Sequence, residues 1–231
     1  MTVDSHESSV YEEQIQLLID LDKLCEDIGQ GLIYDQPTSL AGDYGKQLIW
    51  TIGPSVRMLV WGLENNQNLA AMNGLRTLLE NWANANYVFR AGKKGPEHYL
   101  SKMGESAEYY RNALQELRSN PSLGLKHLKQ APRWTGSGLE ARVEKLGDGP
   151  LFQYEYLSRY VHADVWATLN EFDIQDKTYM KNVMLTWGIE FVNHTSWLIC
   201  EEKLVNDNLL ARATKLNDQV AAILVSDTQE S

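Results

Sequence analysis

Residues 68–90 read NLAAMNGLRTLLENWANANYVFR and carry the clearest helical pattern in the chain. Leu75, Leu78, Leu79 and Trp82 recur at spacings of three and four, which places them on one side of a helix. Arg76 and Glu80 are also four apart, so they form a polar row beside this apolar face. The stretch therefore predicts a helix that buries one face and carries Arg76 and Glu80 in a polar row beside that face.

The same spacing recurs in both directions from this segment, and strand patterns are nearly absent. We predict helices over about 9–28, ended by Gly29 and Gly31, and over about 40–63, with a kink at Gly53-Pro54. Further helices are predicted over 96–119, 122–129 and 151–162, and a long final helix is predicted from 177 to near 205 or 225. The fold class is all-α, a single bundle of five or more helices.

A loop is predicted over residues 131–138, Ala-Pro-Arg-Trp-Thr-Gly-Ser-Gly, followed by a helix capped by Ser137 and Glu140. Trp134 in this loop either covers a ligand site or fills a gap over ordinary core.

Composition sets the remaining expectations. The 231 residues, 43% hydrophobic, contain no divide rich in Pro, Gly or Ser, so we expect one domain over 1–231, with 1–8 and 226–231 as disordered tails. No apolar run suits a membrane span and no signal peptide is evident, which favours a cytoplasmic protein. Cys25 and Cys200 stand singly and are expected to be buried free thiols. No cofactor motif is present, so no cofactor is expected.

The net charge of −10 argues against a general nucleic-acid binder. The charge is uneven, however: residues 90–145 hold eleven Lys or Arg against six Asp or Glu, and the remainder holds ten against twenty-five. The basic middle region is either a solvated helix pair or an anion-facing rim. Its candidate rim residues are Arg90, Lys93, Lys94, Lys126, Lys129 and Arg133.

A second polar segment, Tyr156 to His162, complements the Arg76 row. Ser158 and His162 are four apart and share a helix face. His162 suits a general base because its ordinary pKa lies near neutrality, and Glu80 could orient it. Arg76 or Arg159 could hold a phosphate, with Ser158 as a positioning hydroxyl, which is the set that a metal-independent ribonuclease needs.

Two other interpretations of these residues stay open. In the first, Arg76 and Glu80 form a structural ion pair and the polar group only fixes helix register. In the second, Glu155 and His162 share a face and contribute to a metal site, but the ligand set is short and no metal is expected. A cavity open to solvent at His162 would favour binding or catalysis, whereas a sealed and fully bonded cluster would favour a structural role.

Three motifs occur in order: Leu75-Arg76-x-x-x-Glu80, Trp134-x-Gly136 and Tyr156-x-Ser158-x-x-Val161-His162. Over about residues 40–170 the chain resembles a family of helical proteins from bacteria and their phages that is named only as a domain of unknown function. That family is distantly similar to HEPN domains, which are helical bundles of RNases, toxins and abortive-infection systems. HEPN ribonucleases separate their Arg and His by four to six residues, whereas two residues separate Arg159 and His162.

The resemblance implies a HEPN-like homodimer that binds or cleaves RNA or a phosphorylated ligand, in phage defence or counter-defence. The implied catalytic residues are His162, Arg159 and Glu80, and the implied ligand-binding residues are Arg76, Trp134, Tyr156 and Ser158. The alternative function is a non-enzymatic protein-interaction or scaffold protein, whose polar cluster is structural and whose acidic exterior engages a basic protein partner.

Overall fold

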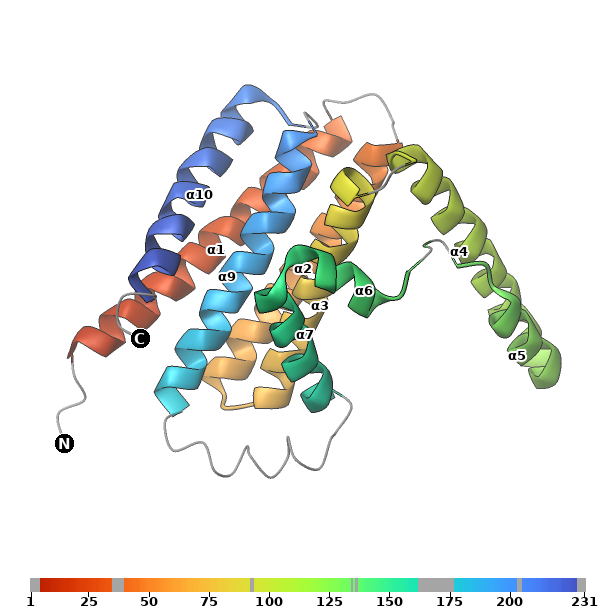
Figure 1. Cartoon of the computed structure of the whole chain (residues 1–231), viewed down its shortest axis with the longest axis horizontal. Helices are drawn as coiled ribbons and strands as arrows, with labels where there is room; N and C mark the ends of the chain where they lie inside the picture. The colour runs from red at the N-terminus through yellow and green to blue at the C-terminus, as the bar shows by residue number, and fades with distance from the viewer. Residues whose placement is uncertain are drawn as a thin grey trace.

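The computed structural model describes residues 5–34, 40–91, 94–133, 135, 137–161, 177–202 and 205–227. These ranges contain nine α-helices, one π-helical turn, one 3₁₀ turn and no strand (Figure 1). The all-α class predicted from the sequence is confirmed. No described helix has both the length and the apolar content that a bilayer span requires.

Five long helices form the main bundle. They are α1 (Ser5–Tyr34), α2 (Leu40–Glu64), α3 (Asn68–Asn86), α9 (Lys177–Glu201) and α10 (Asp207–Asp227). Helix α9 packs against α1, α2, α3 and α10, so it lies at the centre of the bundle. Its Phe191 is fully buried, and the core extends from there to apolar side chains of every neighbouring helix.

Helices α2 and α3 approach each other closely at two glycines. A Cβ added at Gly74 would lie 2.6 Å from the carbonyl oxygen of Ser55 and 3.0 Å from the amide nitrogen of Leu59. At Gly62 a Cβ would lie 2.6 Å from the amide nitrogen of Ala71. Only glycine leaves room for a neighbouring backbone at these distances, and the two glycines set the spacing of the α2–α3 pair.

A smaller layer covers the outer side of α3. It contains α6 (Leu139–Val143), the 3₁₀ turn Glu144–Leu146 and α7 (Asp148–Val161). Both α6 and α7 contact α3, and in Figure 1 they lie in front of it. This packing brings the segment before His162 onto the helix that carries Arg76 and Glu80.

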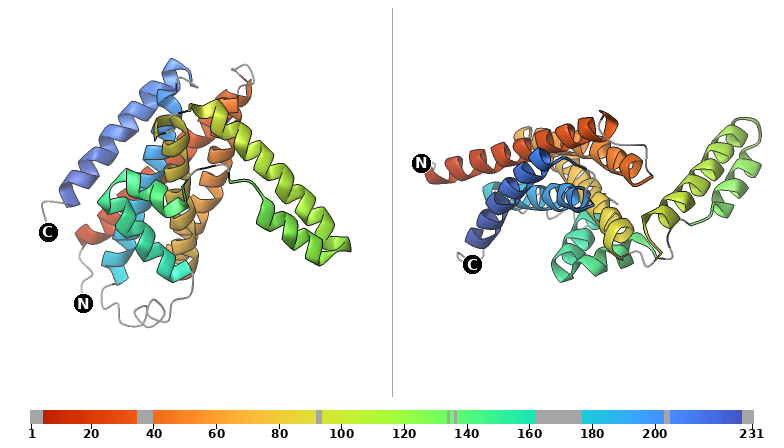
Figure 2. Two further views of the ribbon diagram at one scale, coloured as in Figure 1. Left: turned by 45° about the vertical axis from the view of Figure 1, so that its right-hand side comes forward. Right: turned by 90° about the horizontal axis from the view of Figure 1, so that it is seen from above.

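A helical hairpin projects from the bundle, and we call it the arm. Helix α3 runs into the π-helical turn Tyr87–Ala91, after which α4 (Pro96–Ser119) and α5 (Pro121–Gln130) pack on each other. The side chain of Asn120 accepts a hydrogen bond from the Leu123 amide (3.2 Å) and caps α5. Figure 2 shows both helices pointing away from the remaining helices.

Two predicted helix ends are wrong. Helix α1 continues through Gly29 because an interior glycine costs only about 1 kcal/mol. Its small size also admits Ile49, whose Cγ2 would lie 3.0 Å from a Cβ at that position. The final helix α9 ends at Glu201, near the predicted end at 205, and only the alternative end at 225 is wrong. Residues 207–227 form the separate helix α10, because Asn206 accepts a hydrogen bond from the Leu209 amide (3.0 Å) and starts a new helix.

The predicted cap of α6 is also wrong. Gly138 occupies the N-cap position and makes no side-chain cap. The Ser137 carbonyl instead accepts hydrogen bonds from Thr135 (2.6 Å) and Arg142 (2.8 Å). Residues 92, 93, 134, 136 and 162–176, and the terminal stretches 1–4 and 228–231 of the predicted tails, lie outside the described residues.

The prediction for the cysteines is confirmed: Cys25 and Cys200 are free and buried. Burial raises the pKa of Cys200 to about 12, so its thiol stays protonated near neutrality.

Candidate functional site

The structure brings Arg76, Glu80 and Ser158 together at the contact between α3 and α7. Arg76 Nε donates to Glu80 Oε1 (2.7 Å), and Arg76 Nη1 donates to Ser158 Oγ and to the Tyr154 carbonyl (3.2 Å). Ser158 Oγ donates to the same Tyr154 carbonyl (2.7 Å). We call these four residues the α3–α7 polar cluster.

The guanidinium of Arg76 is the centre of this cluster. The residue is buried, and its Cζ lies 3.9 Å from the centroid of the Tyr154 ring. Stacking on the ring and hydrogen bonding in the guanidinium plane together compensate for the desolvation of the charge. Glu80 is more open, with 38% of its side chain exposed, so the cluster reaches solvent on the carboxylate side.

Tyr154 was missed by the sequence analysis. A signal was available, because Tyr154 and Ser158 are four apart and therefore share a face of α7. Its carbonyl and ring both contact Arg76, and the carbonyl contribution could not be read from the side-chain pattern.

Two other predicted site residues, Arg159 and Tyr156, lie outside the α3–α7 polar cluster. Arg159 is exposed on α7. Tyr156 packs edge-on against Trp187 of α9, with ring centroids 5.8 Å apart, and its hydroxyl donates to Tyr160 (3.3 Å). Burial raises the pKa of Tyr156. His162 and Trp134 lie outside the described residues, so their roles stay predictions.

A second polar cluster, unforeseen from the sequence, surrounds Arg142. This buried side chain donates to Asn84 Oδ1 (3.0 Å), to Thr135 Oγ1 (3.0 Å) and to the Ser137 carbonyl (2.8 Å). Burial lowers the pKa of Arg142 from its ordinary value. The bonds tie the segment before α6 to α3, so they fix where the α6–α7 layer lies on the bundle.

The basic residues predicted as an anion-facing rim are distributed over separate elements. Arg90 forms an ion pair with Glu201 of α9. Lys126 and Lys129 are exposed on α5 of the arm, away from the α3–α7 polar cluster (Figure 1). The distribution matches the solvated alternative better than a rim around one site.

His194 of α9 is part of the aromatic core. Its ring stacks on Trp82, with centroids 4.4 Å apart and planes inclined by 10°. Burial, and then the nearby charge of Arg90, lower the pKa of His194. The imidazole therefore favours its neutral form and serves as part of the aromatic packing.

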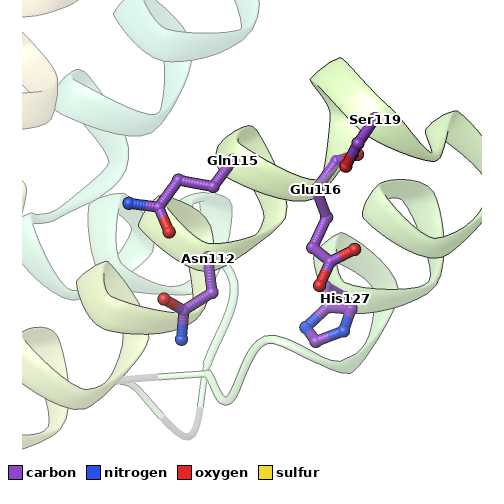
Figure 3. Close-up of a pocket in the computed structure, with 5 residues that line it drawn as sticks. All are labelled: Asn112, Gln115, Glu116, Ser119 and His127. Atoms are coloured by element: carbon purple, nitrogen blue, oxygen red, sulfur yellow. The ribbon is translucent and has the colours of Figure 1, made fainter.

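The α4–α5 hairpin holds a hollow of about 370 Å³. It opens between the two helices, with Glu116 and His127 facing each other across it (Figure 3). Its lining is polar and comes from Asn112, Gln115, Glu116, Ser119 and His127. The hollow belongs to the arm and contains none of the predicted site residues.

A buried carboxylate on α9 gives a test of pH dependence. Gln153 Nε2 donates to Glu190 Oε2 (3.1 Å), and burial raises the pKa of Glu190 although this hydrogen bond lowers it. A raised pKa means that the folded chain binds the proton more tightly than the unfolded chain. The contribution of Glu190 to the free energy of unfolding is therefore greatest below the ordinary carboxyl pKa, and it is lost as the pH rises through the raised pKa.

We expect Glu190→Gln to flatten this part of the pH profile and to raise the free energy of unfolding at neutral pH. Urea unfolding from about pH 4 to about pH 8 measures both effects. Glu155→Gln, at an exposed position of α7, is the matched control and should keep the wild-type profile. An unchanged profile in Glu190→Gln would show that this carboxylate is solvated in the folded protein.

Among the described residues, no three His, Cys, Asp or Glu side chains gather in a way that could hold a metal ion. Comparison of the chain with family models, with curated proteins and with solved structures found no match.

Proposed function

We propose that this chain is a non-enzymatic interaction protein whose exposed helix faces engage another protein. One observation carries the proposal: large apolar side chains face solvent along α2. Trp50 is 68% exposed, Met58 44% and Trp61 54%, and Pro54 lies on the same face. We call these four residues the α2 stripe. The exposed Arg57 lies on the same face between the two tryptophans. Large apolar side chains gathered on an exposed helix face are typical of protein-interaction sites.

The state of the α3–α7 polar cluster supports the same proposal. An anion that approached Arg76 would compete with Glu80, which already accepts from Arg76 Nε at 2.7 Å. It would also compete with Ser158 and the Tyr154 carbonyl for Nη1. A buried guanidinium that is bonded to a carboxylate is better suited to fastening two helices than to capturing phosphate.

A second candidate function is binding or metal-independent cleavage of RNA, or binding of a phosphorylated ligand. It is favoured by the exposed Arg159 beside the cluster and by the solvent-facing side of Glu80. In this function His162 acts as the base and Arg159 as the phosphate clamp.

Incubation with a pool of single-stranded and structured RNA, with and without EDTA, tests for cleavage, and an electrophoretic mobility shift with the same pool tests for binding without cleavage. We expect no cleavage by the wild type, by His162→Ala or by Arg159→Ala. Cleavage that persists in EDTA and is lost in His162→Ala would overturn the proposal and establish a ribonuclease. Arg118→Ala, an exposed arginine on the arm, controls for a general loss of positive charge.

A further inference from the structure

The contact between the two helices of the arm fixes the direction of their other side chains. Ala113 of α4 is fully buried, and a Cβ added at Gly124 of α5 would lie 2.5 Å from Leu117 Cγ of α4. These residues mark the side of each helix that faces the other, and they place Leu117 level with Gly124. Each further residue is turned about 100° around its helix, so the direction of the neighbouring side chains follows.

Large apolar side chains emerge on one side of the arm. Leu114 (62% exposed) is one residue after Ala113, and Leu125 (53% exposed) is one residue after Gly124. Each is therefore turned about 100° from the contact between the helices, in the same rotational sense. Tyr110 (48% exposed) is one turn before Leu114 on the same side of α4. The three side chains form an apolar ridge along the arm.

The hollow lies on the opposite side of the arm. Asn112 is two residues before Leu114, and His127 is two residues after Leu125, so each is turned about 160° from its apolar neighbour. Both line the hollow in Figure 3. Three carboxylates share the side of Asn112 because each is four or seven residues from it: Glu105, Glu108 and Glu116. The acidic side chains of this stretch of α4 therefore turn away from the apolar ridge.

Exposed cations line both long edges of the apolar ridge. On α4, Arg111 is three residues before Leu114 and Arg118 is four residues after it. On α5, Lys126 and Lys129 follow Leu125 by one and four residues. Within the part of the chain that the structure describes, none of these four cations has a carboxylate within ion-pairing distance. We give the name basic arm face to Tyr110, Arg111, Leu114, Arg118, Leu125, Lys126 and Lys129.

The basic arm face is electrostatically separate from the acidic bundle. Residues 110–133 hold five Lys or Arg against one Glu, whereas the remainder of the chain holds sixteen against thirty. Leu114 is fourteen residues beyond Leu100, which is buried at the base of the arm, and this spacing is about 21 Å along α4. The Debye length at physiological salt is about 8 Å. Because the arm points away from the bundle (Figure 2), the repulsion between the acidic bundle and an anionic surface is largely screened there.

We propose that the basic arm face docks on an anionic lipid bilayer, with the arm lying on the bilayer surface. Leu114 and Leu125 reach the boundary of the acyl chains, while the cations on both edges stay level with the lipid phosphates. An anionic bilayer meets both rows of cations at once, because phosphates surround every inserted side chain. The phosphates of RNA would pair with the cations but would leave the two exposed leucines without an apolar partner.

This docking goes beyond the proposed function, because it uses a different surface from the α2 stripe. It is also interfacial: the arm rests on the bilayer, and none of the described helices is suited to cross one.

Vesicle flotation tests the proposal. The wild type should bind vesicles of equimolar phosphatidylcholine and phosphatidylserine, and it should bind phosphatidylcholine vesicles at least about tenfold more weakly. Lys126→Glu with Lys129→Glu should weaken binding to the mixed vesicles at least about tenfold, because each cation near an anionic surface contributes about a fivefold factor. Leu114→Ser with Leu125→Ser keeps the charge and should also weaken binding at least about tenfold, because the apolar insertion is lost.

Two control variants locate the contact. Lys23→Glu with Lys215→Glu makes the same change of charge at exposed positions of α1 and α10, and it should keep vesicle binding within about twofold of the wild type. Trp50→Ser with Trp61→Ser removes the tryptophans of the α2 stripe and should bind vesicles as the wild type does. All variants change exposed side chains and should retain the wild-type melting temperature.

Failure of the wild type to bind the mixed vesicles would overturn the inference, as would equal binding to both kinds of vesicle. Loss of vesicle binding in Trp50→Ser with Trp61→Ser would move the lipid contact to the α2 stripe and overturn it as well. An RNA mobility shift that Lys126→Glu with Lys129→Glu removes, without vesicle binding by the wild type, would assign the basic arm face to RNA instead. The absence of vesicle binding alone leaves the proposed function standing, because RNA cleavage decides that function separately.

Discussion

Arg76→Met should lower the free energy of unfolding by about 2–3 kcal/mol. Methionine fills part of the same space but cannot donate to Glu80, Ser158 or the Tyr154 carbonyl, and it loses the cationic contact with the Tyr154 ring. Hydrogen bonds to charged groups contribute about 1.5–3 kcal/mol. The partial exposure of Glu80 limits the cost, because its carboxylate regains water when Arg76 is removed.

Urea unfolding followed by circular dichroism measures this change. Arg159→Met is the matched control, since it makes the same replacement at an exposed position of α7 and should change stability by less than about 0.5 kcal/mol. Equal stability of the two variants would mean that the α3–α7 polar cluster does not hold α7 to the bundle, and it would revive the ligand-binding function of Arg76.

Gly74→Ala should destabilise the protein by about 3 kcal/mol. The new Cβ would meet the Ser55 carbonyl oxygen at 2.6 Å, and a backbone atom cannot rotate away as a side chain can. Helices α2 and α3 must then separate, and overpacking of a core costs about 1–3 kcal/mol or more. The helix propensity of alanine returns only about 1 kcal/mol of that cost.

Gly104→Ala makes the same replacement in α4, where nothing lies within 4 Å of the added Cβ. This variant should gain about 0.5–1 kcal/mol. Thermal unfolding of the pair isolates the steric effect, because both positions are helical. A Gly74→Ala variant as stable as Gly104→Ala would show that the two helices can move apart without loss.

Local sequence signals predicted much of the fold. Helix α4 begins at Pro96 and ends before Asn120-Pro121, as predicted, because proline suits the first helical turn and then interrupts the next. The Arg76–Glu80 ion pair, one of the interpretations that the spacing left open, is present in the structure. The meeting of Ser158 with this pair, which the two polar segments predicted, is confirmed.

Contacts that depend on tertiary structure could not be predicted. The partners of Arg142 come from α3 and from the segment before α6, and no spacing rule joins Asn84 to Thr135. The break between α9 and α10 depends on a cap at Asn206 whose geometry the apolar pattern does not show. The HEPN-like relationship stays a prediction, as do the roles of His162 and Trp134.

The central place of α9 has a consequence for the order in which the molecule forms. Helix α9 packs against α1 and α3, which the ribosome releases more than 90 residues earlier. Until residues 177–201 emerge, the apolar faces of α1 and α3 have no partner in the middle of the bundle. The nascent chain therefore exposes apolar helix faces during most of its synthesis, and closure of the bundle is a late event. The arm is the exception, because α4 and α5 are adjacent in sequence and can pair as soon as both have left the ribosome.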